Sequence, residues 1–491
     1  MIGRVSSPRT RTRTWLAALC LALALACAPL TTEREVAVGK DAAQQVEQEM
    51  GLVRDAELVA YVQAIGARMA ALSPRKDLSY TFNVVDMAEA NAFALPGGHI
   101  YVSRGLLAIA NSEDELANVI GHEIGHVAAR HHARHQARAQ RVGVASVLGT
   151  LAAAVLGGAE AAQIVGQLGQ TAGAGYLASH SREQEHESDE IGQTLAAGGG
   201  WDPAGMAGFL NTLGRETTLQ LGAERMPSFL DTHPSTPERV EATHARAARL
   251  ARAPTRPVAR DRAAFLAKLD GLVVDEDPAG GLFEGEVFRQ PVMNFRITFP
   301  DDWRTANSAR AVAAIAPDES GLIQLGLAGP GSDPRAAAQK SLSGQKTPVA
   351  EHGPLSIGSL QAYQVRLSQQ TQQGQMGGLF TWIAHGGQVY RVECIAAEQR
   401  FERFAPLCAR TTRSFRPLDS KDRERIRGKV LRVATVNAGE SLAAFGARTG
   451  NVWSPEQTAV ANAMPSPSAF PSDRRLKIAV AVPFRASAGR P

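Results

Sequence analysis

The stretch VIGHEIGHVAARHHARH, from Val119 to His135, contains five histidines and one glutamate in seventeen residues. Ser112 stands just before the helix that we expect here, and Glu115 follows three residues later in the capping-box pattern. The first glycine or proline able to end this helix convincingly comes near Gly143. We therefore expect one helix through the whole stretch.

Two histidines of this stretch are one helical turn apart. At about 100° per residue, His122 and His126 lie roughly 40° apart on one face, so both imidazoles can reach one metal ion. Glu123 can contact a metal-bound water but is poorly placed to be a third ligand, as expected for an HExxH motif. The alternative is an HExxH that arises by chance on a surface helix.

A third metal ligand could come from the same stretch. His132 stands at the metzincin spacing from His122, but that motif needs a glycine at position 129, where this chain has Ala129. If the helix continues, His132 lies about 280° around from His122, off the metal face. His131, His132 and His135 are then expected to be solvated or to lie behind the ligands.

The other candidate is a carboxylate from a second helix. The charged stretch SHSREQEHESDEIG runs from Ser179 to Gly192. It offers Glu185 and, one turn later, Asp189. In such an arrangement Glu185 binds the metal. Asp189 accepts the N–H of a ligand histidine and fixes its tautomer.

Four motifs occur in order along the chain: NAFALPGG from Asn91, EDELANVIGHEIGHVAARH from Glu113, SREQEHESD from Ser181 and THPSTPER from Thr232. Together they resemble the CAAX-prenyl-protease-type zinc metallopeptidases, family M48. Within that family the chain is most similar to the exported BepA-like proteases of bacterial outer-membrane quality control, because it begins with a signal-like segment and lacks multiple membrane spans.

The resemblance implies one zinc ion per chain. His122, His126 and Glu185 match the zinc ligands of the family, and Glu123 matches its general base. Zinc would lower the pKa of its bound water, and Glu123 would take the proton. The resemblance therefore implies peptide-bond hydrolysis.

Three further positions match functional residues of the family. Asp189 matches the aspartate behind the ligands, with Ser188 in place of a common alanine, and His233 with Arg239 matches the HP-x4-R element near the zinc. His233 is either a fourth ligand in a closed, self-inhibited state, a donor to the tetrahedral oxyanion, or a solvated loop residue. The other histidines are expected at the surface or in the core: His99, His180, His186, His244, His352 and His385.

The N-terminus has the pattern of a secretory signal, over residues 1–26. Four arginines precede the apolar run WLAALCLALALA, which ends in small residues before Cys27. Without these arginines the 52 basic side chains fall to 48, against 48 acidic ones, so charge does not indicate nucleic-acid binding. ALAC resembles a lipobox, so Cys27 is either lipidated or merely beside a cleavage site. We expect the chain in the periplasm or at the periplasmic face of the outer membrane.

The predicted fold class is α+β, in several domains. Residues 27–253 predict a mainly helical, zincin-type metallopeptidase domain with a small β-sheet, followed by a linker at 254–284. An α+β accessory domain that resembles PsbP is expected at 285–418, and a LysM-like module at 428–485, whose ending PSDRRLKI argues against glycan binding. The apolar segment 142–158 predicts a packed helix or a membrane-touching hairpin.

Two strands, Tyr80–Asp86 and His99–Gly105, are expected on either side of NAFALPGG. This segment resembles the edge strand of the family, to which a peptide could add by backbone hydrogen bonds. Cys394 and Cys408 predict a disulfide in an oxidising compartment, with two buried free thiols as the alternative.

Two functions are compatible with these features. The first is a zinc-dependent endopeptidase of the bacterial envelope that acts on misfolded or stalled envelope proteins, with outer-membrane assembly machinery as a partner. The second is a non-enzymatic envelope chaperone or adaptor whose metal site is structural. Glu123 favours the first, because a structural zinc site needs no base.

Overall fold

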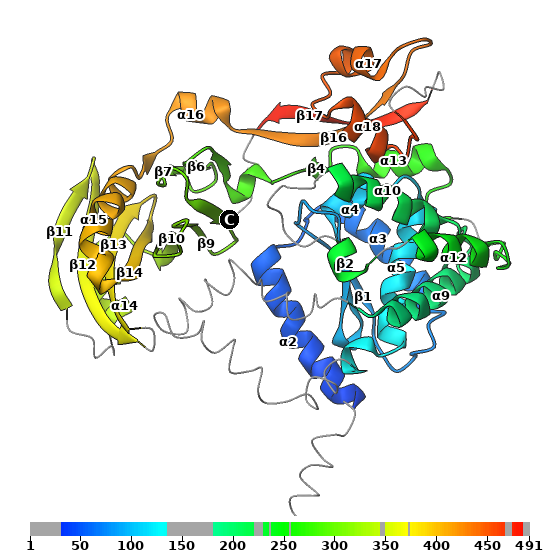
Figure 1. The fold of residues 1–491 in the computed structure, drawn as a ribbon, viewed down its shortest axis with the longest axis horizontal. Helices are drawn as coiled ribbons and strands as arrows, with labels where there is room; N and C mark the ends of the chain where they lie inside the picture. Colours follow the sequence, from blue (N-terminus) through cyan, green and yellow to red (C-terminus); the bar gives the residue numbers. More distant parts are fainter. Residues whose placement is uncertain are drawn as a thin grey trace, which may run out of the picture.

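The computed structural model describes residues 31–134, 180–219, 229–234, 237–254, 257–343, 349–371, 374–466 and 474–484. A helical domain and a β-rich domain lie side by side, and β16 and β17 run above them (Figure 1). The predicted α+β class is confirmed. The expected signal segment, Cys27 and the apolar segment 142–158 lie outside the described residues. None of the described helices is long and apolar enough to cross a membrane.

Side chains cap the starts of α3 and α5, and the cap of α5 at Ser112 is the one predicted from the sequence. The Asp55 side chain accepts hydrogen bonds from the backbone N–H groups of Glu57 and Leu58, at 3.0 and 3.1 Å. Ser112 accepts one from Glu115 at 3.2 Å, so both caps are formed. The elements are α2 (Thr32–Met50), α3 (Ala56–Ala70), β1 (Thr81–Val85), β2 (Ala92–Leu95), η1 (Pro96–Gly98), β3 (His99–Ser103), α4 (Arg104–Ile109) and α5 (Glu113–Ala128).

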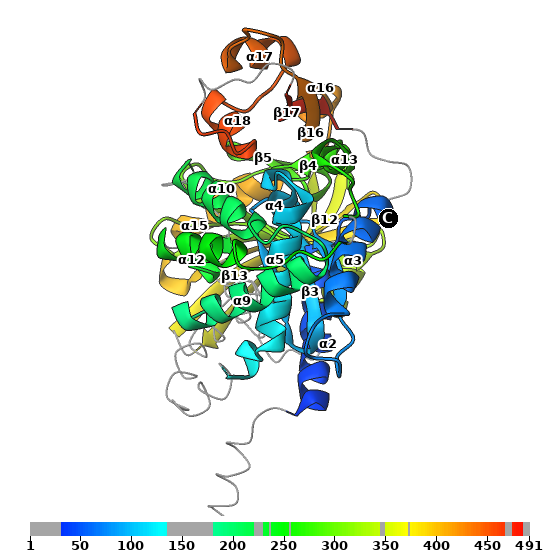
Figure 2. The ribbon, with the colours of Figure 1, turned by 90° about the vertical axis from the view of Figure 1, so that its right-hand side faces the viewer.

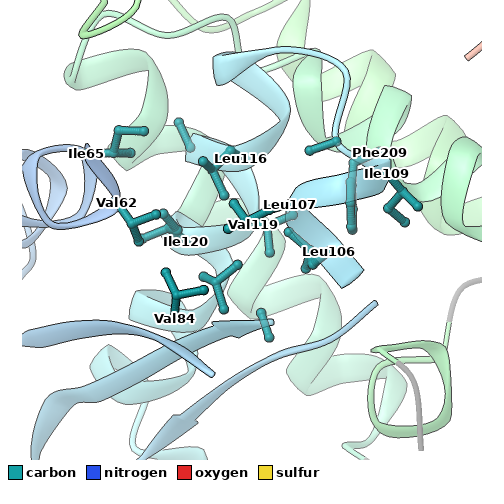
Figure 3. Close-up of a cluster of buried hydrophobic side chains, with 14 of the residues drawn as sticks. Val62, Ile65, Val84, Leu106, Leu107, Ile109, Leu116, Val119, Ile120 and Phe209 are labelled. Carbon is teal, nitrogen blue, oxygen red and sulfur yellow. The ribbon is translucent and has the colours of Figure 1, made fainter. Parts of the chain in front are cut away.

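A small sheet supports α5. Its strand order is β1-β3-β2, with β1 parallel and β2 antiparallel to β3, so β2 is an edge strand. The two strands expected from the sequence, β1 and β3, are therefore formed. Side chains of the sheet, α3 and α5 share one apolar core, in which Val62, Val84 and Ile120 are almost completely buried (Figure 3). This core holds α5 against the sheet.

Helices α5 and α9 (Arg182–Gly198) pack closely because small residues line their contact. A Cβ atom on Gly121 would lie 2.7 Å from the carbonyl oxygen of Gly192, and one on Gly125 would lie 2.8 Å from that of Ser188. Larger side chains would force the helices apart. The helices that follow α9 among the described residues of this domain are α10 (Gly205–Leu219), α11 (Phe229–Thr232) and α12 (Pro237–Ala247).

The end of α5 differs from the prediction. The helix stops at Ala128 instead of continuing towards Gly143, and Arg130 adopts a left-handed conformation with φ of 56°. A short helical turn then begins at His131. The expectation failed because a non-glycine residue takes the left-handed position that a sequence pattern assigns to glycine.

The described residues of the β-rich domain form two sheets. Their orders are β11-β12-β13-β14-β10-β9-β8 and β15-β7-β6-β5. On β13 the neighbours Trp382 and Ile383 point to opposite faces of the larger sheet and belong to different apolar clusters. The face with Trp382 is covered by α14 (Pro334–Leu342), and the face with Ile383 is covered by α15 (Glu398–Arg413). The strands are β5 (Leu282–Glu284), β6 (Val287–Gln290), β7 (Phe295–Thr298), β8 (Arg304–Asn307), β9 (Ala311–Ile315), β10 (Gly321–Pro330), β11 (Val349–Ile357), β12 (Leu360–Thr371), β13 (Gly374–His385), β14 (Gln388–Ala397) and β15 (Arg416–Pro417).

The disulfide predicted between Cys394 and Cys408 is not formed. Both cysteines are free and buried, on β14 and α15. Burial, and then a hydrogen bond with Cys408, raises the pKa of Cys394 well above its ordinary value. They lie in the same apolar cluster as Phe401 and Phe404, where free thiols pack as small apolar groups.

The C-terminal strands pack on the helical domain. The segment expected as a linker contains α13 (Arg262–Leu269), β4 (Val273–Val274) and η4 (Pro278–Gly280). β4 forms a sheet of order β17-β16-β4 with β16 (Arg427–Thr435) and β17 (Arg475–Pro483). Lys477 is buried and donates to the carbonyls of Ala108 and Ala110 at the end of α4, at 2.7 and 2.6 Å. This part of the chain also contains α16 (Ser420–Arg425), α17 (Leu442–Thr449) and α18 (Pro455–Ala461). Figure 2 shows α18 above α10.

Candidate metal centre

Four side chains from α5, α9 and the segment after α11 meet at one point. The Nε2 atoms of His122 and His126 are 2.9 Å apart, and the Glu185 carboxylate lies 3.5 and 3.4 Å from them. His233 Nδ1 is 3.2 Å from His122 Nε2 and 3.1 Å from Glu185 Oε1. One donor atom from each residue lies within 4.8 Å of all the others, and all four residues are buried. This arrangement is a candidate metal centre.

Glu123 lies beside this group. Its Oε1 atom is 3.6 Å from His233 Nε2 and accepts no hydrogen bond from the part of the chain that the structure describes. Burial raises the pKa of Glu123, although the charges of His233 and His122 act in the opposite direction. A buried carboxylate with a raised proton affinity has the properties of a general base.

Asp189 and Arg239 hold the ligands from behind. Asp189 Oδ1 lies 2.9 Å from His122 Nδ1, and Arg239 binds the same carboxylate through two nitrogens, at 2.7 and 2.8 Å. A third Arg239 nitrogen lies 2.6 Å from Glu185 Oε2 and donates to the carbonyl of His233 at 3.3 Å. Arg239 therefore acts on the ligands and on the segment that carries His233.

The two histidines of the HExxH motif experience opposite electrostatic environments. Burial lowers the pKa of His122, but hydrogen bonds to Asp189 and Glu185 outweigh burial and raise it to about 9. Burial lowers the pKa of His126 well below its ordinary value, because Glu185 only partly compensates. Burial opposes ionisation of Glu185, yet the surrounding histidines lower its pKa strongly. Glu185 is thus ionised, as a metal ligand must be.

Two more histidines lie beside His126. His131 Nδ1 is 2.9 Å from His126 Nδ1, and the rings of His180 and His126 have centroids 4.0 Å apart. The three form a second buried group that could hold a metal, and His132 belongs to neither group. From the sequence, His180 is expected only at the surface or in the core. Its position next to Ser181, the N-cap of the helix that carries Glu185, was the signal that could have found it.

The donor set suits zinc. Imidazole nitrogens and a carboxylate oxygen are its usual ligands, and three protein ligands leave a position for water in catalytic sites. His122, His126 and Glu185 can supply three, whereas His233 can supply a fourth and close the site. The residues present therefore fit the zinc ion that the motifs imply.

The edge strand β2 is connected to this centre. Its four residues are buried, and it pairs on one side with β3. The backbone N–H of Phe229, which begins α11, donates to the carbonyl of Ala90 just before β2, at 2.9 Å. The segment that carries His233 is thereby attached to the start of the edge strand.

Residues 57–247 match the profile of Peptidase family M48. This range contains both helices of the centre, the edge strand and His233. Over this range the chain is similar to that family, and the family resemblance drawn from the motifs is confirmed.

Several proteases resemble this part of the chain. The beta-barrel assembly-enhancing protease of Yersinia pestis is 31% identical over 230 residues, 46% of this chain and 47% of that protein. Its namesake from Escherichia coli K12 is 29% identical, over 42% of each chain. The mitochondrial metalloendopeptidase OMA1 of Schizosaccharomyces pombe is 32% identical, over 37% of this chain and 50% of that protein. The chain therefore spans about half the length of these relatives.

Solved structures show weak likenesses to this chain. The solution structure of cyanobacterial PsbP from Synechocystis is matched over 28% of this chain and 96% of that chain, with 10% identity and a TM-score of 0.22. A crystal structure from Bacteroides thetaiotaomicron is matched over 35% of this chain and 59% of that chain, with 12% identity and a TM-score of 0.23.

Proposed function

We propose that this chain is a zinc-dependent endopeptidase of the bacterial cell envelope. The observation that carries the proposal is the buried group of His122, His126 and Glu185 with the unbonded carboxylate oxygen of Glu123 beside it. A structural site would need the ligands but not the base. The position of Glu123 therefore supports hydrolysis over a purely structural metal.

His122, His126 and Glu185 would hold the ion. When bound, zinc activates water and polarises a carbonyl oxygen. Glu123 takes the proton of the attacking water and returns it to the leaving amine, a transfer for which its raised pKa suits it. Asp189 keeps His122 in the tautomer whose Nε2 faces the ion, and Arg239 keeps Asp189 and Glu185 in place. The centre is buried, so bulk water is kept away.

His233 is proposed to close the site. Its Nδ1 atom lies among the other donor atoms, at the place of a fourth ligand, and its Nε2 atom faces Glu123. A fourth protein ligand would displace the water needed for hydrolysis. This contact supports a self-inhibited state over a role as donor to the oxyanion. Movement of the segment after α11 would then open the centre.

Substrates are proposed to be misfolded or stalled envelope proteins. The names of the bacterial relatives associate them with β-barrel assembly, which supports outer-membrane proteins as substrates and their assembly machinery as partner. An extended peptide could add to β2 by backbone hydrogen bonds, which demand little of its sequence. The signal-like segment and Cys27 support export, with or without a lipid anchor.

The accessory regions are proposed to position the protease. Their boundaries, 285–418 and 428–485, and the LysM-like character of the second remain predictions from the sequence. The buried Lys477 contact with α4 supports a fixed placement of the C-terminal strands on the protease domain. A flexible tether would not need such a contact.

The competing function is a non-enzymatic chaperone or adaptor, for which a centre closed by four protein ligands is the supporting observation. Zinc content and casein degradation by the purified chain, with and without a chelator, separate the two. A protease binds one zinc and loses activity with the chelator. An adaptor binds zinc but degrades nothing, in the parent or in His233→Ala.

Alanine substitution of each ligand tests the site itself. His122→Ala, His126→Ala and Glu185→Ala should each weaken zinc binding strongly, because each removes one of the three proposed ligands and leaves only His233 to replace it. Glu183→Ala, on the exposed first turn of the same helix as Glu185, is the control and should retain it. Full retention of zinc in Glu185→Ala would assign the third ligand to His233 instead.

A further inference from the structure

The two histidines of the HExxH motif are held from behind by different partners. His122 Nδ1 meets the carboxylate of Asp189 at 2.9 Å. The corresponding atom of His126 meets another imidazole, His131 Nδ1, also at 2.9 Å. Both histidines of the second contact are almost completely buried, so water cannot replace it. His131 therefore contacts Nδ1 of His126 in the same way that Asp189 contacts Nδ1 of His122.

An unfavourable backbone conformation makes this contact. After α5 ends, Arg130 takes a left-handed φ of 56°, and this turn brings His131 back beside the last turn of the helix. Non-glycine residues avoid that region unless the surroundings compensate. The Arg130 side chain lies 3.2 Å from the buried Glu35 carboxylate, which is one such compensation. The turn places His131 where a continuous helix could not.

The far side of His131 is also occupied. Its Nε2 atom lies 3.0 Å from Glu187 Oε2, and Arg134 donates to the same oxygen at 3.0 Å. The Ser188 hydroxyl makes a longer contact with His131 Nδ1, at 3.4 Å. Glu187 and Ser188 follow Glu185 closely on α9, so the helix that supplies the third ligand also holds His131.

We propose that His131 is a positioning residue that fixes the tautomer and orientation of His126 for metal binding. The inference rests on the proposed function, since it needs His126 to be a ligand. A metal on Nε2 of His126 requires a proton on Nδ1, which donates to His131 Nδ1. His131 then carries its proton on Nε2, and this N–H group donates to the carboxylate of the ionised Glu187. Every nitrogen in this chain of hydrogen bonds has one role.

The same residues allow a competing interpretation. His126, His131 and His180 could hold a second metal ion. His126 would then have to bind metals through both nitrogens and lose both ring protons. The positioning role needs no such step, because the Nδ1 proton of His126 and the Nε2 proton of His131 each meet an acceptor.

The test is zinc affinity, measured by chelator competition, in three purified variants. His131→Leu removes the acceptor and should weaken zinc binding about 10–100-fold. His131→Asn keeps an acceptor near the position of Nδ1 and should recover most of the affinity. A packing role predicts the reverse order, because leucine fills the apolar volume better than asparagine. His132→Leu, on the same turn but in neither histidine group, should bind zinc like the parent.

Glu187→Gln tests the outer end of the arrangement. Glutamine still accepts a hydrogen bond from His131 but without charge, so the loss of zinc affinity should be smaller than in His131→Leu. Glu190→Gln is the control. Glu190 lies on the same helix as Glu187 and its side chain is mostly exposed, so the substitution should leave zinc affinity unchanged.

The outcomes distinguish failure of the proposed zinc protease from failure of the positioning role of His131. If the parent chain binds no zinc, the proposed function fails. If the parent binds one zinc tightly and His131→Leu binds it equally well, only the positioning role fails. Two metal ions per parent chain, with one lost in His131→Leu, would overturn the positioning role in favour of a second site.

Discussion

The candidate metal centre and the core of the large sheet are both buried, yet they contain different kinds of side chain. Around the centre, His122, Glu123, Glu185 and Arg239 are at most 2% exposed. Around β14, the buried side chains of this core are mostly aromatic and aliphatic. The thiols of Cys394 and Cys408 lie among them. Burying polar groups opposes folding unless each has a partner, whereas apolar groups favour it. The apolar core therefore stabilises the sheet domain, whereas the polar groups of the centre have to be paired with one another.

The largest expected effect comes from a substitution that removes the catalytic base of the centre but keeps the shape of its side chain. Glu123→Gln should reduce peptide hydrolysis by roughly 10²–10⁴-fold, because the base is lost while the shape and the ligands remain. Zinc content and thermal unfolding should match the parent. Casein turnover with Glu183→Gln as the control measures the effect, and comparable turnover in both variants would refute the role of Glu123.

A substitution in the sheet core should show the opposite pattern. Phe415→Ala removes an almost completely buried ring that packs against Phe295 and Tyr390, and should cost about 3–5 kcal/mol of stability. Zinc affinity at low temperature should stay unchanged, because the domain contributes no side chain to the centre. Denaturant unfolding and chelator competition on the same sample measure both. A large change in zinc affinity would show that the two regions are coupled.

Glycines at the helix contact lie between these extremes. Gly125→Ala places a methyl 2.8 Å from the Ser188 carbonyl oxygen, so it should destabilise the domain by about 1–3 kcal/mol and weaken zinc binding. Gly214→Ala is the matched control on α10, with nothing within 4 Å of the new methyl, and should stabilise by about 0.5–1 kcal/mol. Equal shifts of the unfolding midpoint in the two variants would contradict the close approach.

Much of the centre was readable from the sequence, for a physical reason. The spacing of His122 and His126 needs only the helical period, and the cap at Ser112 needs only a local hydrogen bond. Glu185 was named through its motif. The predicted continuation of α5 and the predicted Cys394–Cys408 disulfide were wrong, because both depend on how segments pack in three dimensions and not on local sequence.

The smallest expected effect concerns His233. If it closes the site, His233→Ala should raise casein hydrolysis or self-cleavage several-fold while zinc stays bound through the other ligands. A donor to the oxyanion would instead lower the activity when it is removed. Activity and zinc content both equal to the parent's would reduce His233 to a loop residue. Pro234→Ala, next to His233 but without a metal-binding side chain, is the control.

The sequence by itself determined the start of the HExxH helix, the α+β class and the resemblance to Peptidase family M48, because periodicity and local motifs encode them. Only the tertiary structure decided how closely α9 approaches α5, where α5 ends and which histidines lie behind the ligands. Those features depend on two backbones meeting at glycines and on a left-handed turn at Arg130. Neither is favourable alone, and contacts distant in sequence stabilise both.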